Sequence, residues 1–231
     1  DEIKAVADRC TVLRKGKYIG TVDVATTSKE ELSEMMVGRK VQLVMEKTPV
    51  QPGESVLTVQ NLTVKSKKHD KPLVNNVSFN VRRGEIVCIA GIDGNGQSEL
   101  VYALTGLMKA DSGKIFLNNQ DITHMSVRKR NEAGLSHIPE DRHKHGLVLD
   151  YSLEDNIVLQ RYFEPQFTNK LGFLKRKEIR KYANRLIEQY DIRSGQGAVT
   201  KARSMSGGNQ QKAIIAREID KNPELLIAVQ P

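Results

Sequence analysis

Near its start the chain changes from a helical to a strand-like spacing of apolar residues. Apolar residues at helical spacing predict a short helix that includes residues 3–7. Two apolar runs follow, at 10–13 and 18–22, and a basic, glycine-containing segment at 14–17 separates them. We expect these runs to form a pair of strands joined by a turn.

A second short helix is predicted just after this strand pair. Ser28 has the side chain of a helix N-cap, and Glu31 follows it at capping-box spacing. The helix is expected to end near Gly38. Residues 46–54 contain two prolines and a glycine, so we interpret them as a linker.

A larger unit is predicted to begin at residue 55, and its first half is rich in strands. Residues 56–59 and 114–117 are short apolar runs, and 73–81 alternates apolar and polar positions. Residues 86–90 are continuously apolar, which is typical of a strand buried on both faces. A helix is expected directly afterwards, from Leu100, Ala103, Leu104 and Leu107.

The second half of this unit is predicted to be mainly helical over residues 127–190. Ile179, Tyr182, Leu186 and Tyr190 fall on one face of the clearest helix, and we interpret that face as core packing. The apolar run at 225–229 predicts another buried strand.

Composition narrows the class of protein. The chain has 231 residues, 39% hydrophobic and 28% charged, which is typical of a soluble globular protein. The pattern shows neither a bilayer-spanning apolar run nor a signal peptide. Cys10 and Cys88 are far apart and lie near apolar residues, so we expect free core thiols in a reducing compartment.

The excess of basic over acidic residues has several possible explanations. The net charge of +8 is compatible with nucleic acid, an anionic lipid surface or phosphate-bearing ligands. Clusters of cations occur at 65–71, 128–130 and 175–181. Aromatic residues make up only 5% and do not interleave with these clusters, so we expect no nucleic-acid partner.

One glycine-rich segment lies where a phosphate loop is expected, between the strand at 86–90 and the following helix. Gly91 and Gly96 have P-loop spacing, and backbone N–H groups of such a loop hold phosphates at a helix N-terminus. Ser98 stands where this motif coordinates Mg²⁺. Gln97 stands where the motif has lysine, so we expect phosphate binding weakened by roughly tenfold or more, because a charged hydrogen bond becomes a neutral one.

A second possible anion site lies far downstream. Ser206, Gly207 and Gly208 come directly before a predicted helix, where free N–H groups and a hydroxyl are available. The segment 222–229 then reads as a turn that leads into an apolar strand.

The order of these motifs resembles the ATP-binding cassette (ABC) transporter ATPases. The segment 205–212, Met-Ser-Gly-Gly-Asn-Gln-Gln-Lys, is similar to their signature loop. Together with Ile-Pro-Glu-Asp-Arg at 138–142, it resembles the sugar and nucleoside importers, which carry two cassettes in one polypeptide. The implied fold class is α/β: a P-loop NTPase with a mixed sheet and a helical subdomain, incomplete at both ends.

The resemblance covers nearly the whole chain and implies its division. Residues 1–22 correspond to the end of a first cassette, 23–54 to an inter-cassette helix and linker, and 55–231 to a second cassette truncated at Walker B. The helical subdomain is expected at about 140–200, and the D-loop and switch histidine lie beyond the chain.

The resemblance also implies binding residues. ATP and Mg²⁺ are the expected cofactors, and Ser98 is the weak Mg²⁺ ligand. The implied nucleotide-binding residues are Gly91, Asp93, Gly94, Asn95, Gly96, Gln97, Ser98 and Glu99. The implied signature-loop residues are Ser206, Gly207, Gly208, Asn209 and Gln210.

No catalytic residue of the family pattern is intact. Val229 stands at the Walker B aspartate position, Gln230 at the catalytic glutamate position and Glu140 at the Q-loop position. Valine accepts no hydrogen bond, and glutamine is not a general base. Residues 64–70 also contain no aromatic side chain that stacks on adenine.

The signature loop resembles the family pattern whereas the catalytic positions do not, and this difference predicts separate roles for the two cassettes. The second cassette would be non-hydrolytic and would supply its signature loop to the first cassette's site. The full-length protein would be a transport-coupled ATPase on the cytoplasmic face of the membrane. Its partners would be permease subunits and, indirectly, a substrate-binding lipoprotein; the fragment alone would be inactive.

Two alternatives remain open at this point. A soluble ABC ATPase that acts on nucleic acid or the ribosome uses the same chemistry, although 23–54 is too short for the charged helical pair of such proteins. A regulatory ATP-binding module also fits the fragment. The end of the chain, 228–231, resembles nucleoside importers more than ribose or galactose importers.

Overall fold

The computed structural model describes residues 2–40, 50–66, 70–92 and 94–230. Contacts divide the chain into two compact units, residues 1–50 and 51–231. The predicted linker at 46–54 and the adenine-contact segment at 64–70 therefore lie partly outside the described residues. No helix in these described ranges is long and apolar enough to cross a membrane.

The first unit consists of a strand pair and two short helices. α1 (Glu2–Val6) precedes the antiparallel strands β1 (Arg9–Arg14) and β2 (Lys17–Asp23), and α2 (Lys29–Val37) follows. The Ser28 hydroxyl accepts the Glu31 backbone N–H at 3.1 Å, which caps α2 as its sequence predicts. Val12, Val24 and Leu32 are the buried core of this unit.

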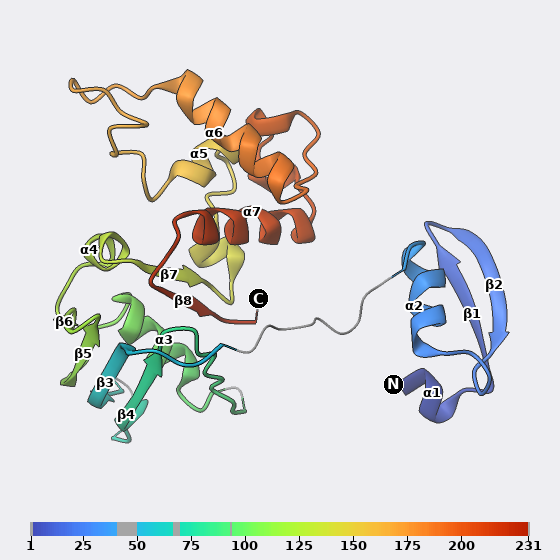
Figure 1. Cartoon of the computed structure of the whole chain (residues 1–231), viewed down its shortest axis with the longest axis horizontal. Coiled ribbons are helices and arrows are strands. Elements are labelled where there is room, and N and C mark those ends of the chain that lie inside the picture. The colour runs from blue at the N-terminus through green and yellow to red at the C-terminus, as the bar shows by residue number, and fades with distance from the viewer. Residues whose placement is uncertain (1, 41–49, 67–69, 93, 231) are drawn as a thin grey trace. The chain divides into compact units, whose positions relative to one another are not determined.

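The second unit contains a four-stranded antiparallel sheet in the order β4-β3-β5-β6 (Figure 1). Its strands are β3 (Ser55–Val64), β4 (Val74–Arg82), β5 (Ser112–Leu117) and β6 (Gln120–Asp121). α3 (Gln97–Thr105) buries Leu100, Ala103 and Leu104 in the same apolar core as this sheet. The core therefore fixes the helix that follows the phosphate loop.

A separate parallel pair joins two strands distant in sequence. β7 (Leu135–Ile138) and β8 (Leu225–Ala228) pair over their full length, and the Val229 N–H donates to the Ile138 carbonyl at 3.0 Å. This pairing brings the segments after the two strands, which begin at residues 139 and 229, to the same end of the pair.

The remaining elements form the helical part of this unit. They are α4 (Val127–Glu132), a π-helical turn (Arg142–Gly146), α5 (Leu153–Val158), α6 (Arg176–Gln189), two 3₁₀ turns (Gly197–Val199 and Ala202–Ser204) and α7 (Gly207–Asp220). Ile179, Tyr182 and Leu186 are buried on the predicted face of α6, and Tyr190 packs against the same cluster. That prediction of core packing is confirmed.

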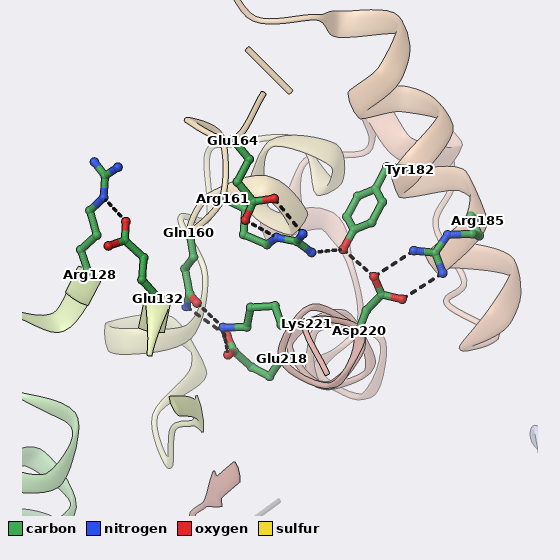
Figure 2. Close-up of polar contacts among 10 residues, drawn as sticks. All are labelled: Arg128, Glu132, Gln160, Arg161, Glu164, Tyr182, Arg185, Glu218, Asp220 and Lys221. Atoms are coloured by element: carbon green, nitrogen blue, oxygen red, sulfur yellow. Dashed lines mark hydrogen bonds and ion pairs between the residues drawn. The ribbon is translucent and has the colours of Figure 1, made fainter. Parts of the chain in front are cut away.

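A polar network holds α7 against the other helices of this part (Figure 2). The Tyr182 hydroxyl donates to Asp220 at 2.7 Å, and Arg185 pairs with the same carboxylate at 2.8 Å. Lys221 donates to the Gln160 amide oxygen at 2.6 Å and pairs with Glu218 at 2.5 Å. α7 is thus tied by charge and hydrogen bonds to segments on both sides of it.

Four expectations from the sequence are corrected by the structure. Residues 86–90 form no strand; among the described residues no strand pairs with them, and Ile86 is 80% exposed. An apolar run becomes a strand only where a neighbouring strand takes its backbone hydrogen bonds, and none in the described ranges does. Cys10 and Cys88 are free, as expected, but Cys10 is half-buried and Cys88 is exposed rather than in the core.

The other two corrections concern strands. Residues 127–190 are only partly helical, because 135–138 forms β7 and irregular turns occupy much of the remainder. Residues 225–228 form a strand, but its side chains alternate between half-buried and exposed instead of being buried on both faces. One parallel neighbour and one covered face account for this pattern.

Candidate phosphate-binding site

The phosphate loop runs into the start of α3. Gly96 is the N-cap of this helix, with φ of +94°, a left-handed conformation that favours glycine. A Cβ on Gly96 would lie 2.2 Å from the Leu73 carbonyl oxygen, so the residue just before β4 and the loop are in close contact here. The backbone N–H groups at the start of α3 face the loop, as an anion site requires.

The Gln97 side chain lies across this loop. Its Nε2 donates to the Ile92 carbonyl at 3.2 Å, and a Cβ on Gly91 would lie 2.0 Å from the same nitrogen. An amide therefore occupies the place over the loop where the motif has an ammonium group. Asp93 lies outside the described residues, and Glu99 is half-buried in the first turn of α3.

Ser98, Glu140 and Gln230 come together although they are far apart in sequence. The Ser98 hydroxyl donates to Glu140 Oε2 at 3.3 Å, and the Gln230 amide donates to Glu140 Oε1 at 3.3 Å. The parallel pairing of β7 with β8 produces this meeting, because Glu140 follows β7 and Gln230 follows β8. The sequence placed each residue in a motif but did not predict their contact.

These contacts also define what could hold a metal ion. Within the described ranges no group of three or more His, Cys, Asp or Glu side chains is placed to bind one. The Ser98 hydroxyl and the Glu140 carboxylate are hard oxygen donors, and Mg²⁺ is usually held by one or two carboxylates together with substrate phosphates. These two oxygens therefore fit a Mg²⁺ ion that arrives with phosphate, whereas Val229 offers no side-chain ligand.

The start of α7 is the second segment that the sequence predicts as an anion site. Ser206 is the exposed N-cap of this 14-residue helix, and its hydroxyl accepts the Asn209 side-chain N–H at 2.9 Å. Gly208 is exposed, and a Cβ there would meet nothing within 4 Å. Gln210 is buried and donates to the Ala202 carbonyl at 2.9 Å, so it holds the segment that precedes the helix.

The segment after β7 reaches both sites. Asp141 caps the π-helical turn and accepts the Lys144 and His143 backbone N–H groups, which lower the pKa of its carboxyl. His143 Nε2 hydrogen-bonds Gln210 Oε1 at 2.9 Å. Glu140, just before this turn, accepts the hydroxyl of Ser98 in α3, and His143 within the turn bonds Gln210 in α7. The segment that follows β7 therefore connects α3 to α7.

Arg142 lies against the start of α7. Its Nη2 is 3.0 Å from where a Cβ on Gly207 would be, and its Nε is buried with no hydrogen-bond partner in the described structure. Sequence reasoning used 138–142 only as part of a resemblance and assigned no role to Arg142 or His143. The signal available was a run of charged side chains between two glycine-rich motifs.

The two anion sites are not joined directly. Of the residues that the structure describes, none in the phosphate loop makes a hydrogen bond or ion pair with Ser206, Gly207 or Gly208. Each lies at the start of its own helix, and that each holds an anionic group stays a prediction of the sequence.

A phosphate loop capping α3, a serine beside a carboxylate, and a helical part between β7 and β8 define a P-loop nucleotide-binding cassette. The chain belongs to the ABC transporter family, whose model matches residues 74–230. The fold agrees with a solved structure described as the ATP-binding cassette MJ0796 bound to ADP and Pi. That likeness has a TM-score of 0.61 at 22% identity and covers 74% of this chain and 72% of that chain.

Two curated relatives are similar over nearly the whole chain. The nucleoside import ATP-binding protein NupA of Lactococcus lactis is 52% identical over 100% of this chain. The guanosine import ATP-binding protein NupO of Bacillus subtilis is 52% identical over 98%. The chain spans a little under half of each relative, 45% and 44% respectively.

Proposed function

We propose that this chain is the nucleotide-binding part of an ABC importer subunit that uses ATP hydrolysis to drive uptake of nucleosides or simple sugars. The proposal is supported by 52% identity to two proteins described as nucleoside and guanosine import ATP-binding proteins. The complete subunit would work at the cytoplasmic face of the membrane. It would drive permease subunits that receive substrate from a binding lipoprotein.

We further infer that the chain is mostly a second cassette whose own site does not hydrolyse ATP. The observation that carries this inference is the Ser98–Glu140–Gln230 contact. Gln230 brings an amide, not a carboxylate, to Glu140, which also accepts the hydroxyl of Ser98, the serine that would hold Mg²⁺ with phosphate. An amide does not remove a proton from water, and Glu140 is already engaged by both neighbours.

The start of α7 would instead serve a first cassette in the same polypeptide. Ser206, Gly207 and Gly208 would complete that cassette's site, where N–H groups and the helix dipole stabilise charge on the transferring phosphate. Ser206 and Gly208 are exposed and Gly207 is half-buried, so this helix start is open to a partner, as such a role requires. Arg142 beside Gly207 would add a positive charge near the same phosphate.

The test is the ATPase rate of the complete polypeptide. The double variant Ser206→Ala with Gly207→Ala should lower the rate by at least about tenfold, because removing one donor to a transition-state oxyanion typically costs about a hundredfold or more. Gln230→Ala should leave the rate within about twofold, since we assign its site no chemistry. Ser204→Ala, an exposed serine before α7, is the matched control. Full activity in the double variant, or its loss in Gln230→Ala, would refute the separate roles of the two cassettes.

A second prediction concerns affinity at the chain's own site. Gln97→Lys should tighten Mg-ATP binding by roughly tenfold, because the ammonium group makes a charge-assisted contact with phosphate that the amide does not. Isothermal titration calorimetry of the chain and the variant measures the difference. Equal affinities would mean that the glycine-rich backbone alone holds the nucleotide. No binding by either would mean that more than one charge is missing.

A further inference from the structure

The connection from α5 to α6 carries an exposed apolar tip. We call residues 168–174 the α5–α6 tip; in Figure 1 this connection extends outward past the start of α6. Leu171 is 81% exposed and Phe173 is 69% exposed. Nothing described above, neither the phosphate loop nor the start of α7, uses these side chains.

The tip is held in shape by its own hydrogen bonds. The Asn169 side-chain oxygen accepts the Leu171 N–H at 3.0 Å and the Phe173 N–H at 2.9 Å. The Asn169 N–H donates to the Phe173 carbonyl at 3.0 Å. Leu171 and Phe173 are therefore displayed on an ordered turn.

The base of the tip is anchored in the helical core. Phe167 is fully buried and packs edge-on against Tyr182, with ring centroids 5.0 Å apart. The Lys175 N–H donates to the Phe167 carbonyl at 2.7 Å, and its ammonium group donates to the Pro165 carbonyl at 2.8 Å. The tip therefore projects from a packed base just before α6.

Cations are frequent in the sequence on both sides of the two apolar residues. Residues 169–181 contain six lysines and arginines and one carboxylate, Glu178. Arg176 pairs with Asp155, and Arg180 pairs with Glu154. The exposed side chains of Lys170, Lys177 and Lys181 make no ion pair with any described residue.

We propose that the α5–α6 tip, with Lys170, Lys177 and Lys181, is a docking surface for an anionic lipid surface. Exposed apolar side chains with exposed lysines nearby in the sequence match the membrane interface, where rings and aliphatic groups enter the headgroup region and ammonium groups meet anionic headgroups. Each lysine near such a surface strengthens binding by about fivefold, so three contribute on the order of a hundredfold. This contact requires neither nucleotide nor permease and extends beyond the proposed function.

The first experiment is flotation of the chain with protein-free vesicles. Vesicles of phosphatidylcholine with about 30% phosphatidylglycerol should carry the chain, whereas pure phosphatidylcholine vesicles should not. Raising salt from about 0.05 M to about 0.5 M should release most of the bound chain, because charges at the surface are screened. If the chain does not float with the anionic vesicles at low salt, the proposal is overturned. The exposed tip would then be assigned to contact with a protein partner.

Matched variants separate the tip from net charge. Lys170→Gln, Lys177→Gln and Lys181→Gln together should lower the partition coefficient by on the order of a hundredfold. Leu171→Ser with Phe173→Ser should lower it by about tenfold or more, because two apolar side chains leave the interface. The charge control is Lys4→Gln, Lys15→Gln and Lys17→Gln, and the apolar control is Val6→Ser with Leu13→Ser, all exposed in the first unit.

Both controls should bind vesicles as the unchanged chain does. All four variants should keep its melting temperature, since they change exposed side chains. A charge control that weakens binding as much as the tip charge variant would assign the effect to net charge and overturn the proposal. Because the assay contains no ATP, a chain that fails the ATPase test above can still pass this one.

Discussion

Replacing Glu218 with alanine should destabilise the second unit by about 3–5 kcal/mol, the cost of removing one partner from a buried ion pair. Glu218 is fully buried between Arg217 and Lys221, at 2.9 and 2.5 Å. Burial acts to raise the pKa of Glu218, but these two cations outweigh it and hold the pKa below its usual value. The carboxyl is therefore charged at neutral pH, and its loss leaves two cations without their counter-ion.

The position of Glu218 spreads this effect beyond α7. Gln160, beyond the end of α5, donates to the same carboxylate at 3.0 Å, and the His137 backbone N–H on β7 donates to it at 3.4 Å (Figure 2 shows the Gln160 side). Loss of the carboxylate would remove hydrogen bonds that hold α7 against β7 and against the segment after α5. In urea unfolding, we expect the second unit of Glu218→Ala to unfold in a single transition with a lower midpoint concentration than that of the unchanged chain.

Two control variants separate the effect of the Glu218 charge from the effect of removing any glutamate. Glu218→Gln keeps the volume and one oxygen but not the charge, so its loss of unfolding free energy should be smaller than that of alanine. Glu178→Ala removes an exposed glutamate from α6 and should change stability by less than about 0.5 kcal/mol. A loss below about 1 kcal/mol for Glu218→Ala would show that the two cations find other partners or water.

Gly96→Ala should disrupt the phosphate loop more than any other single methyl group added there. The new Cβ would lie 2.2 Å from the Leu73 carbonyl oxygen, a backbone atom that cannot rotate away. The left-handed φ of +94° adds strain of about 1–3 kcal/mol for a residue with a side chain. Overpacking typically adds about 1–3 kcal/mol, so a lower melting temperature and loss of measurable Mg-ATP binding are expected together.

Gly94→Ala is the matched control. Gly94 also has a positive φ, +86°, but a Cβ there would meet nothing within 4 Å. It therefore carries the backbone strain without the collision. If thermal unfolding and calorimetry gave the same result for both variants, strain alone would explain the effect and the contact with Leu73 would not matter.

Local pattern predicted much of this fold because the governing interactions are local. The Ser28 cap, the helix after the phosphate loop and the buried face of α6 depend on residues within a few positions of one another. Side-chain capping and 3.6-residue periodicity act over that range.

Strand predictions were less secure because a strand depends on its neighbours. Residues 86–90 are as apolar as a buried strand, yet they pair with none in the described ranges. β7 was absorbed into a helical prediction, although it pairs with β8, about ninety residues away. Sequence pattern alone does not supply the hydrogen-bond partner that makes an extended segment a strand.

The sequence by itself determined the motif inventory: a phosphate loop with glutamine in place of lysine, a glycine-rich helix start, and the absence of a carboxylate at 229 and 230. Residue type sets charge and hydrogen-bonding capacity wherever the residue lies. Only the tertiary structure decided that Glu140 meets both Ser98 and Gln230, and that Arg142 lies at Gly207. Those contacts depend on the parallel pairing of β7 with β8, a long-range interaction that no local pattern records.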